Sequence, residues 1–573
     1  MSRIFASVVA VLVLSACQSN PTMPVPAKAP PPPMASHDEM AMSGPPQTIA
    51  AWARGAMLFD NLGGYTRKAS TGSPEAQQYF DQGMRLLWAF NHDESTRSFA
   101  KAAELDPKCA ICYWGVALTV GPNYNVPVMA EPRAKVAYEA EQLAQQNAAG
   151  ASKVEQALIA ALAQRYPDAQ PLDPSNSAPV LKAYADAMRK VAHAFAADTD
   201  VQVLFAESAM NLNAWKLWGL DGKPAPGTLE IEATLEAALK REPDHPGANH
   251  YYIHAMEASR HPEKAVPAAE RVGAMMPGAG HLVHMPAHIL QRVGRYEDAA
   301  QANRSGAAAD KVYLSQTQPL DYYGMYVAHN WQFLAYSAAM EGRKAEALEA
   351  ARKTLAYMPD EMLNAMPGFD WCVTLTYPVM LRFGLWDDIL AEPAPNPAFK
   401  ARYGGWLYAK TVALAATGRT DEAKTSLAEL EKTAAKMPAD YGACFNTGKD
   451  VLAVASLIAR ARIARADGHA DESIKLLRAA VALEDKLNYD EPADWFAPVR
   501  HSLGAELLAA GQAKAAEAVY REDLKRNRGN GWSYYGLAQA LRAQKKAAAA
   551  DAMDQKYKDA FAHADVTLAA SAY

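Results

Sequence analysis

The sequence has no excess of basic charge and no hydrophobic run long enough to cross a membrane. Its 57 Lys and Arg side chains are outnumbered by 63 Asp and Glu, which gives a net charge of −6. A dedicated nucleic-acid binder shows a basic face, so we expect no nucleic-acid partner. The lack of long apolar runs predicts a chain that is soluble apart from any anchor at its start.

Motifs of nucleotide, haem and hydrolase chemistry are also missing. The segment GACFNTGKD (442–450) has one residue too many between its glycines for a phosphate-binding loop, and Asp450 replaces the required Ser or Thr. Cys109-Ala-Ile-Cys112 is followed by Tyr113, where a haem-attachment motif has His. No stretch resembles a nucleophile elbow. We therefore expect no nucleotide, no haem and no serine-hydrolase site.

The cysteine pair Cys109 and Cys112 leaves several alternatives open. Outside the cytoplasm such a pair forms a local disulfide, a redox pair or half of a metal site. We favour a structural disulfide, or two packed thiols, at the turn of a helical hairpin. Cys372 and Cys444 are far apart in the sequence, which leaves open whether they pair.

The first 17 residues have the features of a secretory signal. They contain a single Arg, an apolar run from Ile4 to Leu14 and a small-residue cleavage signature. The segment Leu14-Ser15-Ala16-Cys17 resembles a bacterial lipobox, which implies cleavage after residue 16 and lipidation of Cys17. An ordinary signal peptide with an incidental cysteine is the alternative. Gln18 after the cysteine favours the outer membrane, facing the periplasm, over the inner one.

From about residue 75 the chain repeats one pattern. Gly-Arg, followed four positions after the Arg by a small residue, opens the segments at 294–308, 342–359 and 418–432. The segments at 468–480 and 511–524 repeat the pattern with the Arg replaced. The two helices of one hairpin cannot bury their apolar stripes alone, so neighbouring hairpins must stack.

These segments resemble the tetratricopeptide repeat (TPR) family, with a small residue where the two helices cross and Pro closing the second helix. The resemblance covers most of residues 75–570. It implies an all-α solenoid of helical hairpins, a right-handed superhelix whose concave groove binds a protein or peptide. We therefore divide the chain into a signal peptide (1–16), a disordered Pro-rich tether (17–50), N-terminal repeats (51–240), His-rich central repeats (241–360) and C-terminal repeats (361–573).

Two histidine pairs mark the central repeats. HYYIH contains His250 and His254, and HMPAH contains His284 and His288. Each histidine of the second pair lies 34 residues after its counterpart in the first pair. This interval is the TPR period, so the pairs are expected at equivalent places on neighbouring helices. Residues i and i+4 share a helical face. By the TPR resemblance, that face lines the concave groove.

Further side chains are expected on the same groove wall. Glu257 lies about one turn beyond His254, His281 precedes the second pair, and His329 occupies the position of His281 in the next repeat. Imidazole is a common ligand of Zn, Cu, Ni and Fe, and packed helices lie about 8–10 Å apart, so the pairs could reach one ion. The alternative is that these histidines cap helices or form hydrogen bonds within the solenoid. The predicted metal ligands are His250, His254, Glu257, His281, His284, His288 and His329.

Two features limit this hypothesis. Tyr251 and Met285 stand where a zinc metalloprotease would have its catalytic Glu, so that class loses its general base. Pro286 lies inside HMPAH and predicts that its helix either starts late, at His281 to His284, or kinks. A late start would remove the i,i+4 geometry of the second pair.

The leading functional hypothesis is an envelope-anchored scaffold that holds a protein or peptide in its groove and carries a histidine-rich metal site there. The alternative is a periplasmic metal-binding protein or metal-dependent enzyme that uses the two histidine pairs with Zn or Cu. We favour a non-enzymatic role, and the sequence indicates no substrate.

Overall fold

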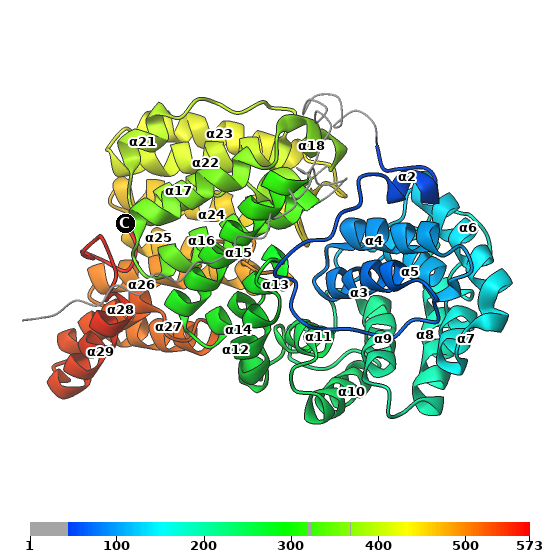
Figure 1. Ribbon diagram of the computed structural model, residues 1–573. Coiled ribbons are helices and arrows are strands. Elements are labelled where there is room, and N and C mark those ends of the chain that lie inside the picture. The colour runs from blue at the N-terminus through cyan, green and yellow to red at the C-terminus, as the bar shows by residue number, and fades with distance from the viewer. Residues whose placement is uncertain (1–43, 318–322, 367) are drawn as a thin grey trace, which may run out of the picture. The chain divides into compact units, whose positions relative to one another are not determined.

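The computed structural model describes residues 44–317, 323–366 and 368–573. The predicted signal peptide, the lipidation site Cys17 and most of the tether lie outside these residues. Pro45–Tyr573 packs as one unit built from successive helices (Figure 1).

The helices up to the first histidine pair are α2 (Ile49–Ala53), α3 (Pro74–Trp88), α4 (His92–Leu105), α5 (Ala110–Val120), α6 (Glu131–Asn147), α7 (Lys153–Leu162), α8 (Ala178–Ala194), α9 (Thr199–Met210), α10 (Thr228–Arg241) and α11 (Pro246–Met256). Short 3-10 turns are η1 (Ala148–Gly150), η2 (Asn211–Asn213) and η3 (Pro262–Ala265).

The array continues with α12 (Val266–Met275), α13 (Gly280–His284), α14 (Pro286–Arg292), α15 (Tyr296–Gln316), α16 (Tyr323–Met340), α17 (Lys344–Ala356), α18 (Asp360–Ala365), α19 (Phe369–Cys372), α20 (Thr376–Arg382) and α21 (Trp386–Ala391). The last helices are α22 (Lys400–Ala416), α23 (Thr420–Lys436), α24 (Gly448–Ala466), α25 (Ala470–Glu484), α26 (Val499–Ala509), α27 (Ala513–Arg526), α28 (Gly531–Ala543) and α29 (Ala547–Ala560).

Consecutive helices pack against each other along the chain, as in α3–α4, α16–α17, α22–α23, α24–α25 and α28–α29. The strands found in the described residues are β1 (Gly442–Ala443) and β2 (Asn446–Thr447), a two-residue antiparallel pair. The predicted all-α fold of stacked helical hairpins is therefore confirmed.

The repeated Gly-Arg motif makes the hairpin turns. Gly294, Gly342, Gly418, Gly468 and Gly511 all have positive φ, between 74° and 86°. Glycine adopts this left-handed conformation without the steric cost that a Cβ would add, and it ends the first helix of each hairpin.

The small residue four positions after the Arg position lies in the second helix and is buried. Ala299, Ala347, Ala423 and Ala516 are 0% exposed, and Ser473 is 1% exposed. A larger side chain at these places would push the two helices apart, so the pattern seen in the sequence follows from close helix crossing.

Two disulfides join the four cysteines of the described residues. Cys109 and Cys112 are bonded at the N-terminus of α5, with Cys109 as the residue that precedes the helix. Cys372, at the end of α19, is bonded to Cys444 between β1 and β2.

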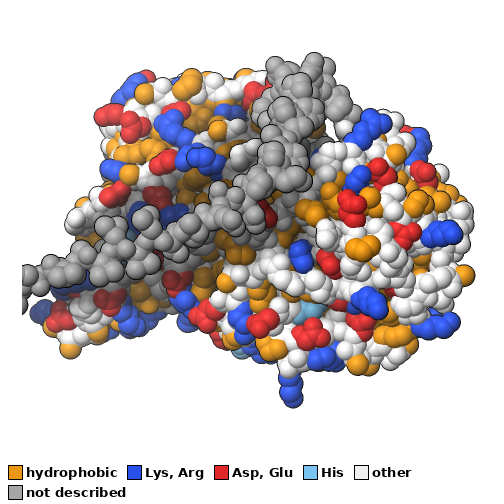
Figure 2. Space-filling view, viewed as in Figure 1, with side chains coloured by type: hydrophobic (Ala, Val, Ile, Leu, Met, Phe, Trp, Pro, Cys, Tyr) orange, Lys and Arg blue, Asp and Glu red, His pale blue; other side chains and the backbone are white. Residues whose placement is uncertain are grey.

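The described residues were compared with two classes, membrane-spanning proteins and proteins with a basic face. No helix among the described residues is both long enough and apolar enough to cross a bilayer. On the face in Figure 2, basic and acidic side chains are intermixed.

Candidate metal centre

The central helices bring the predicted histidines together in two groups of three. His250 and His254 of α11 meet His281 of α13, and their ligand atoms lie within 4.8 Å of one another. His284, His288 of α14 and His329 of α16 form the second group on the same criterion. We call these sets the first triad (His250, His254, His281) and the second triad (His284, His288, His329).

Pro286 kinks the helix without separating the second pair. Helix α13 ends at His284, Met285 keeps a helical conformation with φ −51° and ψ −32°, and α14 begins at Pro286. The Nε2 atoms of His284 and His288 are therefore 2.9 Å apart. A late helix start, the outcome that would have removed this geometry, does not occur.

One part of the sequence hypothesis is wrong. The histidines do not line an open groove, because the side chains of the first triad and of His284 and His288 are only 0–2% exposed. His329 alone is partly exposed. Each sequence pair is joined by a third histidine from another helix, His281 for the first pair and His329 for the second.

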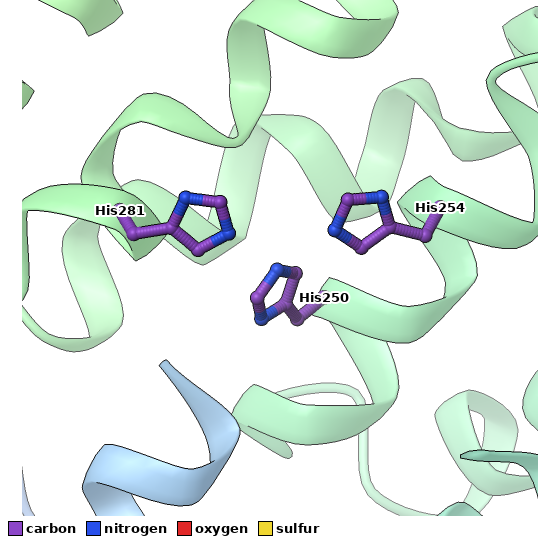
Figure 3. A group of neighbouring side chains, drawn as sticks. All are labelled: His250, His254 and His281. Carbon is purple, nitrogen blue, oxygen red and sulfur yellow. The ribbon is translucent and has the colours of Figure 1, made fainter. Parts of the chain in front are cut away.

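In the first triad, hydrogen bonds fix which ring nitrogen carries the proton. His250 donates from Nδ1 to the Trp88 carbonyl over 2.6 Å, and His254 donates from Nδ1 to Glu257 Oε1 over 3.0 Å. Both acceptors can only accept, so the Nε2 atoms of both rings keep their lone pairs. Among the described residues these Nε2 atoms, and both nitrogens of His281, have no hydrogen-bond partner. Figure 3 shows the three rings turned toward one another.

In the second triad, Asn303 fixes the proton of His284. The Asn303 amide nitrogen donates to the Ala299 carbonyl over 2.7 Å, so its oxygen is the atom that faces His284. His284 Nδ1 lies 2.6 Å from that oxygen and must donate to it. The lone pair of His284 is therefore on Nε2, which faces His288.

Gln332 fixes His329 in the same way. The amide nitrogen of Gln332 donates to the Cys372 carbonyl over 3.1 Å, which leaves its oxygen as the acceptor for His329 Nδ1, also 3.1 Å away. His329 thus keeps its lone pair on Nε2. Metal-binding histidines are held by this arrangement, in which the nitrogen opposite the metal donates to a carbonyl or carboxylate.

His288 has carboxylates on its other side. Its Nδ1 lies 2.7 Å from Glu257 Oε2 and 2.8 Å from Glu491 Oε2. Burial alone would lower the pKa of His288, but the adjacent carboxylates Glu257 and Glu491 raise it to about 9. The Nε2 atoms of His284 and His288 would present two lone pairs to each other at 2.9 Å, so a proton or another cation between them is required.

Glu257 lies on the outer side of two of the rings. Its carboxylate contacts the Nδ1 atoms of His254 and His288, on the side of each ring away from the triads. Burial raises its pKa, but His254 and His288 outweigh that effect and lower it to about 2, so Glu257 is ionised. Glu257, His288 and Glu491 also lie close enough to hold an ion. Because that ion would displace the Nδ1 proton, we assign Glu257 the role of orienting both rings.

The five triad histidines other than His288 are neutral at pH 7. Burial lowers the pKa of all five, to about 3 for His329, because a charged imidazolium loses its hydration there. A neutral imidazole is the form that binds a metal ion.

A phenylalanine ring packs on each triad, and the sequence hypothesis missed both. The Phe90 ring centroid lies 4.1, 5.4 and 5.5 Å from those of His250, His254 and His281. The Phe333 centroid lies 4.8, 4.6 and 4.8 Å from those of His284, His288 and His329. Phe90 has a φ of 57°, which is unusual for a bulky residue. No spacing in the sequence connects Phe90 with residues 160 positions away.

The chain is similar to known proteins only at the level of distant structural likeness. No protein-family model and no curated protein matches it. Among solved structures, the human IFIT1 dimer with m7Gppp-AAAA is 11% identical, with a TM-score of 0.34 over 90% of this chain and 98% of that chain. The APC/C hetero-tetramer Cut9–Hcn1 is 13% identical, with a TM-score of 0.28 over 87% of this chain and 76% of that chain. At these TM-scores the similarities support no conclusion about function.

Proposed function

We propose that this protein binds two transition-metal ions, copper by preference, one in each histidine triad. The observation that carries the proposal is the direction of the ring hydrogen bonds. Four of the six histidines donate from Nδ1 to an acceptor, and Nδ1 of His288 contacts the Glu257 carboxylate, which leaves Nε2 of these five rings directed at the triads. Buried polar atoms without partners cost about 1–3 kcal/mol each, and an ion in each triad would satisfy them together.

The ligand set favours copper over other metals. Each triad offers three imidazoles and no thiolate or carboxylate within the described residues. Carboxylate-rich sites suit Mg, Ca and Mn, whereas imidazole suits Zn, Cu, Fe and Ni. For a fixed set of nitrogen ligands, Cu²⁺ binds more tightly than Zn²⁺ or the other divalent ions of the series.

The site is placed in the cell envelope as part of the same proposal. The lipobox-like segment ending at Cys17 supports a lipid-anchored protein at the outer membrane, facing the periplasm. Capture of a protein or peptide by the helical array is a second proposal, supported by the hairpin repeats. A separate experiment distinguishes this second proposal from metal binding, because partner binding should survive replacement of the histidines.

Metal analysis of the purified full-length protein tests the proposal. We expect metal-depleted protein to take up two copper ions per chain and to prefer copper when zinc is present in equal amount. His250→Ala and His329→Ala should each retain about one ion, because each removes one triad.

His193→Ala is the matched control, since His193 is an exposed histidine of α8 and should leave two ions bound. No copper uptake by the unmodified protein, or an equal loss in the control, would refute the metal centre.

A further inference from the structure

Each triad leaves its ion with an open coordination position. Neither group includes a fourth His, Cys, Asp or Glu among the described residues. Closed structural zinc sites have four protein ligands, whereas reactive metal sites have three and keep a position for water or substrate. By this rule neither triad is a closed structural site.

The two triads are neighbours. Across the triads, the ring centroids of His254 and His288 are 5.5 Å apart, and those of His281 and His284 are 5.6 Å apart. Within the first triad, the centroids of His250 and His254 are 5.0 Å apart. Rings of different triads are therefore nearly as close as rings of one triad.

Glu257 connects the two triads through their ring protons. One oxygen of its carboxylate accepts from His254 and the other contacts His288. A single rigid carboxylate thus fixes a ring in each triad, which holds the two ion positions in one relative geometry.

The space beside the centre admits only a small ligand. A cavity of about 110 Å³ is bordered by His281 together with Gly280, Tyr313 and Tyr323. A second cavity, of about 170 Å³, is bordered by Glu491. Pockets for drug-sized organic ligands are about 300–1,000 Å³, so these cavities suit water, a diatomic molecule or a small anion.

Among these small ligands, the positive charge of the two metal ions favours an anion. None of the six imidazole ligands carries a negative charge, so the charge of two divalent ions is uncompensated at the ligand atoms, and bound cations are the largest local charges in such a site. The Glu257 carboxylate contacts the Nδ1 atoms of His254 and His288 and so lies behind the rings. An anion between the ions would face both charges directly.

We propose that the two copper ions form one coupled centre that binds a single small anion between them, of the size of hydroxide or azide. This inference rests on the proposed function and adds to it a reactive, ligand-exchanging site. The two open positions belong to neighbouring triads, whose nearest rings are 5.5 and 5.6 Å apart and which both contact Glu257.

Electron paramagnetic resonance (EPR) and azide titration of full-length copper-loaded protein test this inference. We expect the integrated Cu(II) spin to fall well below the copper content, because a bridging anion couples the two unpaired electrons. Azide should saturate its charge-transfer absorbance at one azide per two copper ions.

His250→Ala and His329→Ala should each keep about one copper, with one full spin per ion and no azide binding at the 1:2 ratio. Circular dichroism measures their helix content and so shows whether they fold. The spin count of the unmodified protein tests the inference even if a variant fails to fold. Full spin for two bound coppers, with azide binding at one per copper, would overturn the coupled centre while leaving the metal site intact. Absence of bound copper would overturn both proposals.

Discussion

Asn303 and Gln332 are amides whose orientation is set by a second hydrogen bond to a backbone carbonyl. Each thereby offers its oxygen to the Nδ1 of a histidine, His284 and His329 respectively. A histidine that merely filled the core would need no such control of its tautomer. The amides therefore belong to the centre although neither is a ligand.

Replacing Asn303 with Leu tests this role, since Leu keeps the size and removes the acceptor. Loss of a partner behind a ligating histidine typically lowers metal affinity about 10–100-fold, and we expect a loss in that range for the second triad alone. Competitive titration with a copper chelator measures it. Asn303→Asp keeps an acceptor oxygen and should recover most of the affinity. Equal weakening of both triads would contradict the assignment.

At the scale of helices, the Gly-Arg turns and the Pro286 kink decide where side chains point. In these turns a Gly with positive φ, such as Gly294 or Gly342, ends one helix and lets the next fold back against it. The kink at Met285 keeps His284 and His288 in contact across the helix break. These local events position the triads on neighbouring helices.

Two glycine turns of the same conformation should differ in their tolerance of a side chain. Gly418 has a φ of 76° and open space around an added Cβ, so Gly418→Ala should cost about 1–2 kcal/mol from backbone strain. Gly294 has a φ of 86°, and its Cβ would lie 2.6 Å from the Arg528 carbonyl oxygen. We expect Gly294→Ala to lower the midpoint of urea unfolding at least twice as much. Equal shifts in the two variants would rule out the backbone clash.

At the scale of the whole molecule, burial of carboxyl groups gives stability a dependence on pH. Burial raises the pKa of Glu141 to about 8 and that of Glu484 to about 8. In the unfolded chain a Glu ionises near pH 4.3. Each of these two carboxyl groups therefore binds more protons in the folded state between about pH 4 and 8, so its contribution to stability falls as the pH rises through that window.

Glu141 allows this dependence to be measured with one substitution. Glu141 is 0% exposed, so ionising it in the folded state costs on the order of 5 kcal/mol. We expect the urea midpoint of the unmodified protein to fall between pH 6 and 9. Glu141→Gln should fall less and be the more stable of the two at pH 9. Parallel curves for the two proteins would show that Glu141 ionises without cost.

The sequence by itself determined the helical-hairpin repeats, because turn glycines and small crossing residues act within one hairpin. Ala299 and Gly294 illustrate this, since local geometry requires both. The sequence also located all six histidines of the triads, because their spacing follows the repeat. Their metal binding, the lipid anchor and the partner stay predictions.

Only the tertiary structure decided how the histidines divide and what surrounds them. His281 joins the first triad and His329 the second because helix packing, rather than spacing, sets which rings meet. Phe90 and Glu491 come from distant parts of the chain and reach the triads only through the fold. Their burial, and the proton placement on each ring, depend on contacts that no local pattern encodes.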